Sequence, residues 1–72
     1  MSYSKLVGCY RVRVEALPDV FVDGVPWDLY RDYRGNYYCG SVDGADCVEH
    51  LHAKTYEDAV KETTMYVVSL FI

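Results

Sequence analysis

The sequence predicts a small α+β fold, in which one C-terminal amphipathic helix packs on one face of an antiparallel β-sheet, a meander of three to four strands. Short runs of alternating apolar and polar residues fill residues 10–53, and turn clusters containing glycine separate them. From Thr55 onward the apolar residues recur three and four positions apart, which is typical of a helix. A chain of 72 residues forms a single domain, 1–72, because independent domains start at roughly 50 residues.

The first strand is expected at residues 10–16, where apolar residues at even positions alternate with charged residues at odd positions. Pro18 should close this strand, because proline has no N–H to donate to a ladder. A short extended arm follows at residues 20–25, with its turn at Asp23-Gly24, since glycine accepts a positive φ there. Pro26 restricts this arm to a sheet edge.

The middle of the chain predicts a hairpin. Its strands are expected at residues 27–33 and 37–42, and Arg34-Gly35-Asn36 supplies the turn between them. A second turn cluster at residues 43–46 leads into a fourth extended run at residues 47–53. These runs complete the predicted meander.

The C-terminal helix has a recognisable start. Thr55 and Asp58 have the spacing of a capping box, in which a side-chain oxygen accepts a hydrogen bond from a backbone N–H of the first turn. The last eight residues are rich in β-branched and aromatic side chains, so a terminal strand remains an alternative for them.

One helix covers one face of a sheet, so the sequence predicts that the opposite face is open. That face should carry Arg11, Arg13 and Glu15 from the first strand and Asp28, Tyr30 and Asp32 from the second. Tyrosine offers a large flat contact with little rotamer entropy to lose, and the eight tyrosines exceed what this core needs. We therefore expect tyrosine to be exposed on an interaction surface.

The charge is unevenly distributed along this small acidic protein. Residues 1–36 sum to zero, whereas residues 37–72 hold two lysines against six acidic residues and therefore carry the whole net charge of −4. An acidic half repels phosphate backbones and anionic lipids, which makes nucleic acid unfavourable and a basic protein surface the expected partner. The longest apolar run is far below the roughly 20 residues of a membrane span, so no membrane partner is expected.

Cys39, Cys47, His50 and His52 lie within fourteen residues and include the ligand types that zinc prefers. Their spacing argues against a site, because the two histidines share a strand face that Cys47 does not, and no Cys-x2-Cys knuckle is present. We expect no metal and no cofactor. The chain also lacks a nucleophile elbow and a phosphate-cradling glycine loop, so no enzyme activity is expected.

The cellular compartment is predicted from the N-terminus and the cysteines. The first residues lack the apolar region of a secretory signal. Three cysteines cannot all pair within one chain, and we expect all three to be reduced thiols. Both observations predict a cytoplasmic protein.

A rival signal lies in residues 30–38, where tyrosines are interleaved with Arg31 and Arg34. This combination is typical of proteins that stack single-stranded bases while holding the backbone. Asp28 and Asp32 offset the two arginines, so single-stranded nucleic-acid binding stays an alternative.

Three short segments carry a family resemblance: Gly35-Asn36-Tyr37, Val42-Asp43-Gly44 and residues 54–59. Together they resemble the strand, turn, strand and helix start of HicB-like antitoxins and of AP2-like or integrase arm-binding domains. The resemblance covers about 25 residues, and it implies the predicted fold and a regulatory role as antitoxin. The turn before the helix lacks the Pro-Gly-Cys of HicB-like proteins.

These observations predict a non-catalytic protein-binding module. The leading hypothesis is a viral protein, an inhibitor of the phage or mobile-element type resembling anti-CRISPR proteins, which blocks a basic surface of a nucleic-acid-handling partner. The expected contact residues are acids and tyrosines: Asp28, Tyr30, Asp32, Tyr37, Asp43, Asp46 and Glu49. A homodimer is the further expectation, because residues 20–25 and the tail Leu70-Phe71-Ile72 leave apolar groups uncovered.

Overall fold

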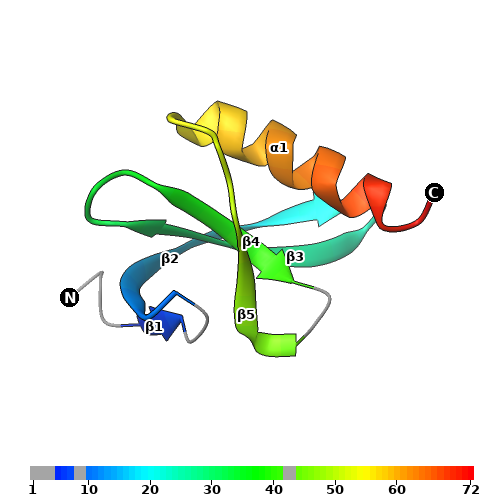
Figure 1. Cartoon of the computed structure of the whole chain (residues 1–72). Helices are drawn as coiled ribbons and strands as arrows, with labels where there is room; N and C mark the ends of the chain where they lie inside the picture. The colour runs from blue at the N-terminus through cyan, green and yellow to red at the C-terminus, as the bar shows by residue number, and fades with distance from the viewer. Residues whose placement is uncertain (1–4, 8–9, 42–43) are drawn as a thin grey trace.

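The computed structural model describes residues 5–7, 10–41 and 44–72 (Figure 1). It confirms the predicted class: an antiparallel sheet whose strands follow one another in chain order, with one C-terminal helix packed on one face. The elements are β1 (Lys5–Val7), β2 (Val12–Val22), β3 (Val25–Asp32), β4 (Tyr37–Ser41), β5 (Gly44–His50) and α1 (Tyr56–Ser69). Strand β1, paired with the start of β2, adds a fifth strand to the meander that the sequence pattern predicts.

Strand β2 does not end at Pro18, so that prediction is wrong. The strand continues to Val22, and its register against β3 shifts between Leu17 and Val20. Leu17 pairs with Leu29 and Val20 pairs with Trp27, so β2 has one residue more than β3 between these two pairs. This is the geometry of a β-bulge. Proline is tolerated at a bulge, and the extra residue turns both Leu17 and Val20 toward the helix side.

The β2–β3 hairpin has the predicted Asp-Gly turn. Asp23 has a φ of 53° and Gly24 a φ of 81°, and Val22 pairs with Val25 across the turn. Two positive φ angles define a type I′ turn, whose twist matches that of the flanking strands. Pro26 pairs with β2 alone, because β4 joins β3 further along the strand. This end of the hairpin is therefore a free edge.

Helix α1 starts where the sequence predicts it, because Thr55 Oγ1 accepts a 3.2 Å hydrogen bond from the backbone N–H of Asp58. The helix continues to Ser69, so the alternative of a terminal strand is wrong. Strand β5 ends at His50, earlier than the predicted residue 53. The backbone N–H of His52 instead donates to the carboxylate of Glu62 on α1 at 2.9 Å, which ties the connection to the helix.

The main core lies between the sheet and α1, which crosses one face of it (Figure 1). Its buried residues come from β2, β3, β4, the β5–α1 connection and the helix: Val20, Leu29, Tyr37, Cys39, Leu51, Ala53 and Ala59. The helix also buries Thr63 and Val67.

The face away from α1 is less open than predicted. Strands β1 and β5, at opposite edges of the sheet, contact each other, so the sheet is curled, and both lie on the side away from α1 (Figure 1). A second buried cluster fills this face: Val14, Tyr30, Tyr38 and Val48. The rings of Tyr10 and His50 add to it, with centroids 5.6 Å and 4.9 Å from that of Tyr38. The expectation of a broad uncovered face is therefore wrong, because curling lets the protein's own residues cover most of it.

Candidate functional site

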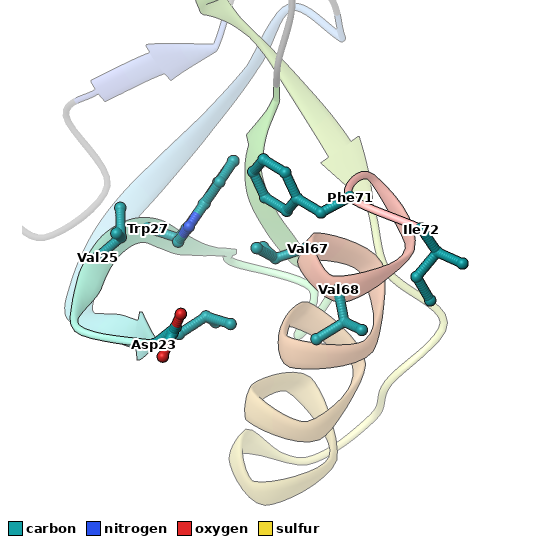
Figure 2. A pocket seen from close by; sticks show the side chains of 8 residues that line it. Asp23, Val25, Trp27, Val67, Val68, Phe71 and Ile72 are labelled. Carbon is teal, nitrogen blue, oxygen red and sulfur yellow. The ribbon is translucent and has the colours of Figure 1, made fainter.

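The first candidate site is a groove between the tip of the β2–β3 hairpin and the C-terminal end of α1 (Figure 2). It has a volume of about 450 Å³. We call it the apolar groove, and its lining residues are Val22, Asp23, Val25, Trp27, Val67, Val68, Phe71 and Ile72. Figure 2 shows Trp27 of β3 and Phe71 at the end of α1 facing each other across it.

Apolar side chains that line the groove are exposed to solvent. Val25 is 53% exposed, Val68 45% and Phe71 78%, whereas Val67 beneath them is buried. The groove forms because the hairpin extends beyond β4 and the last turn of α1 lies over its free edge. Asp23 is the one charged residue of the lining. Contiguous exposed apolar surface of this kind marks interaction sites.

The second candidate site is on the opposite face, around the β3–β4 turn. This hollow, which we call the arginine cavity, has a volume of about 620 Å³. Three arginines line it together with two tyrosines and smaller polar and apolar groups: Arg11, Val12, Arg13, Asp32, Tyr33, Arg34, Asn36 and Tyr38.

Asp32, only 4% exposed, organises the β3–β4 turn beside the arginine cavity. Its carboxylate accepts hydrogen bonds from the backbone N–H groups of Arg34 and Asn36, both at 2.9 Å, and from the Asn36 amide at 3.1 Å. The Tyr38 hydroxyl donates a fourth at 2.8 Å. Burial acts to raise the pKa of Asp32, but the hydrogen bonds from Asn36 and Tyr38 outweigh it and lower that pKa below its usual value. Asp32 is therefore ionised at neutral pH.

Tyr38 is held in its neutral form. Burial, followed by its hydrogen bond to the Asp32 carboxylate, raises the pKa of Tyr38 to about 12. Its ring stacks on that of His50 and lies near that of Tyr10. Tyr38 is thus a fixed hydrogen-bond donor of the second cluster rather than a proton-transfer group.

The predicted contact residues differ in exposure. Asp28 and Glu49 are exposed. Asp43 lies outside the described residues, and Asp46 lies on β5 with a side chain outside the described set.

The predicted tyrosine anchors are buried, which corrects the expectation that they are exposed. Tyr30 and Tyr37 are each 5% exposed, and the Tyr30 hydroxyl donates to the Asp28 carboxylate at 3.0 Å. Tyr37 packs under the helix, and Tyr30 packs in the second cluster, so these residues and Asp32 serve the fold. Exposed apolar surface lies instead at the apolar groove. The apolar groups of residues 20–25 and of the tail at residues 70–72 indicate this surface in the sequence.

The cysteines and histidines suggested by the sequence as zinc ligands are not brought together. Cys39 is a free thiol buried on the helix side, whereas His50 lies in the ring cluster on the opposite face. Burial raises the pKa of Cys39 to about 11, so the thiol is protonated at neutral pH. Among the described residues, no group of His, Cys, Asp and Glu is arranged to hold a metal ion.

Cys47 is disulfide-bonded, so the prediction that all three cysteines are reduced is wrong. An odd number of cysteines leaves room for one disulfide beside one free thiol. A disulfide also removes Cys47 as a nucleophile and as a metal ligand.

Comparison with known proteins finds no match: no family model, no curated protein and no solved structure is significantly similar to this chain. The similarity to HicB-like antitoxins therefore stays a prediction. Within residues 5–7, 10–41 and 44–72, no helix combines the length and apolar character needed to cross a membrane.

Proposed function

We propose that this protein is a non-catalytic binding module whose apolar groove accepts an apolar side chain from a basic segment of a partner protein. The observation that supports it best is the apolar groove, where Val25, Val68 and Phe71 are exposed around Trp27. A central apolar anchor surrounded by polar contacts is the usual design of a binding hot spot.

Charge complementarity favours a basic occupant. The lining takes its residues from positions 22–27 of the β2–β3 hairpin and 67–72 at the C-terminal end, and none of its side chains is a lysine or an arginine. Its one charged residue is the exposed Asp23. The lining thus carries a carboxylate without a compensating cation. A partner with lysines or arginines flanking an apolar side chain matches this pattern.

The proposed function includes inhibition of the partner protein. A protein that handles nucleic acid has a basic surface, and a module bound there by an apolar anchor and carboxylates blocks it sterically and electrostatically. The expected cytoplasmic location relied in part on reduced thiols, and the disulfide at Cys47 removes that support, because disulfides are rare in the cytosol.

The test uses Trp27, the single tryptophan of the chain, as a fluorescent probe inside the groove. The probe ligands are a short peptide of leucine and lysine, and the same peptide with glutamate replacing every lysine. We expect the lysine peptide alone to shift the Trp27 emission to the blue, with an affinity that falls as salt is raised.

Two variants and two matched controls locate the binding. Phe71→Ala removes an exposed groove side chain and should weaken the lysine peptide about tenfold, whereas Met65→Ala, equally exposed on α1 but outside the groove, should not. Asp23→Asn removes the groove charge and keeps a residue that suits the type I′ turn, and Asp28→Asn is its control outside the lining.

Binding of both peptides with equal affinity, or equal loss in Phe71→Ala and Met65→Ala, contradicts the proposal. A second copy of the chain is the other possible occupant. Gel filtration at two concentrations detects it, and a dimer that Phe71→Ala dissociates would replace the partner protein by a homodimer.

A further inference from the structure

The arginine cavity concentrates positive charge in a protein of net charge −4. Three of the seven basic residues of the chain line it: Arg11 from the β1–β2 connection, Arg13 from β2 and Arg34 from the β3–β4 turn. Arg34 is distant in sequence from Arg11 and Arg13, and it meets them because the β3–β4 turn lies beside the start of β2. The local charge is therefore opposite to that of the whole chain.

Asp32 does not require the arginine side chains as partners. Its carboxylate accepts hydrogen bonds from two backbone N–H groups, the Asn36 amide and the Tyr38 hydroxyl, all of them neutral donors. Arg34 contributes its backbone N–H to this set, and its guanidinium Nε donates to the Tyr33 hydroxyl. The lining thus contains three guanidinium groups and one carboxylate.

One side of the cavity presents a flat aromatic surface. Tyr33 is 70% exposed, and the guanidinium of Arg34 lies 5.4 Å from its ring centroid. Arg34 Nε also donates a hydrogen bond of 3.1 Å to the Tyr33 hydroxyl, which fixes the two side chains relative to each other. Aromatic rings and guanidinium planes are the surfaces on which nucleobases stack.

The backbone of Arg11 has a conformation that few residues adopt. Its φ is 55°, in the left-handed region that favours glycine. Backbone strain of this kind persists where the surroundings fix it, and it is concentrated at functional sites. Here the preceding residue, Tyr10, is held by the rings of Tyr38 and His50. That cluster positions Arg11 at the cavity.

We propose that the arginine cavity binds a phosphate-bearing ligand with an aromatic base, of the size of a mononucleotide. Arg11 and Arg34 would hold the phosphate group, and Tyr33 would stack against the base. The volume of about 620 Å³ lies in the usual range for small-molecule sites, roughly 300–1,000 Å³. A long nucleic acid is disfavoured, because the acidic remainder of the chain repels an extended phosphate backbone.

Ligand binding in the arginine cavity is independent of partner binding in the apolar groove. The apolar groove lies on the helix side and the arginine cavity on the other face, and the two linings share no residue. A ligand in the cavity would add a second function to the module.

The test is titration calorimetry at low salt with three probes: adenosine 5′-monophosphate, ribose 5-phosphate and adenosine. We expect the nucleotide to bind most tightly, the sugar phosphate more weakly and adenosine not measurably. Arg11→Gln and Arg34→Gln should each weaken the nucleotide about tenfold, since each removes a charge-assisted contact. Arg34→Gln keeps the backbone N–H bound to Asp32, and circular dichroism confirms folding of each variant.

Lys61→Gln is the matched control, because it removes one exposed positive charge from α1, outside the cavity lining. It should leave nucleotide binding unchanged. Tyr33→Ala should weaken the nucleotide and leave ribose 5-phosphate unaffected. The proposal is overturned if the nucleotide does not bind at millimolar concentration, if Lys61→Gln weakens it as much as Arg11→Gln does, or if an oligonucleotide binds more tightly per molecule than the mononucleotide.

Discussion

The hydroxyl of Tyr38 on β4 donates a 2.8 Å hydrogen bond to the carboxylate of Asp32 at the end of β3. The same carboxylate accepts the backbone N–H groups that close the β3–β4 turn. One buried acid therefore fixes both the turn and the ring at the centre of the second cluster. The arginine cavity depends on this arrangement, because Arg34 lies within the turn.

Replacing Asp32 with alanine should destabilise the protein by about 2–4 kcal/mol. The substitution leaves the buried Tyr38 hydroxyl and two turn N–H groups without their acceptor. Urea unfolding followed by circular dichroism measures the change. Asp19→Ala, at an exposed position in β2, serves as the control and should stay within about 0.5 kcal/mol of the parent.

Stability should fall in acid in a way that depends on Asp32. The pKa of Asp32 is lower in the folded protein than in the unfolded chain, so its contribution is fully present above about pH 4 and is lost as the pH falls through the folded value. Urea midpoints from pH 6 to pH 2 should decline less steeply in Asp32→Asn than in the parent. Identical slopes would show that other carboxylates cause the acid sensitivity.

In alkali the relevant group is Tyr38. Burial and the neighbouring Asp32 carboxylate raise the pKa of Tyr38 to about 12, above the value of about 10 in an unfolded chain. Its neutral form therefore stabilises the fold below pH 10, and this contribution is lost as the pH rises toward 12. Tyrosinate absorbance should show a late-titrating ring that is missing in Tyr38→Phe. A titration with no late component in the parent would refute the assignment.

The cysteines should differ in reactivity. Cys39 is fully buried, and burial raises its pKa to about 11, so a thiol reagent at pH 8 should modify it only after unfolding. Cys47 should remain unmodified in unfolded protein until a reductant is added, because it is disulfide-bonded. Peptide mapping by mass spectrometry distinguishes the two. Modification of Cys47 without reductant would contradict the disulfide.

The helix cap gives a further prediction. Thr55→Ala removes the oxygen that accepts the N–H of Asp58 and should cost about 1 kcal/mol of unfolding free energy. Thr55→Ser keeps the hydroxyl and is the matched control. Equal destabilisation by both substitutions would assign the effect to the lost methyl group instead of the cap.

The features that the sequence predicts correctly depend on local chemistry. Thr55 and Asp58 mark the helix start because a cap needs only neighbouring residues. Asp23-Gly24 marks the hairpin because a type I′ turn needs two positive φ angles in succession. Each of these two motifs spans at most four consecutive residues, so it can be recognised without knowing the rest of the fold.

The features that it does not predict depend on the whole sheet. Strand alternation assigns Tyr30 to the face away from the helix but says nothing of the curling that buries it. Pro18 is compatible with β2 only because a bulge accommodates it, and the bulge is defined by pairing with β3. The apolar groove likewise requires the hairpin and the end of α1, more than forty residues apart, to be placed side by side.

The five strands lie in the sheet in the order in which they occur in the chain. Each strand can thus add to its predecessor through a short loop, whereas the helix and the contact between β5 and β1 return over strands formed earlier. Pairing of consecutive strands is fast, because little loop-closure entropy is lost before each pairing forms. Most oxidised protein diluted from urea should refold within milliseconds, with the pairing of β2 and β3 as its earliest step.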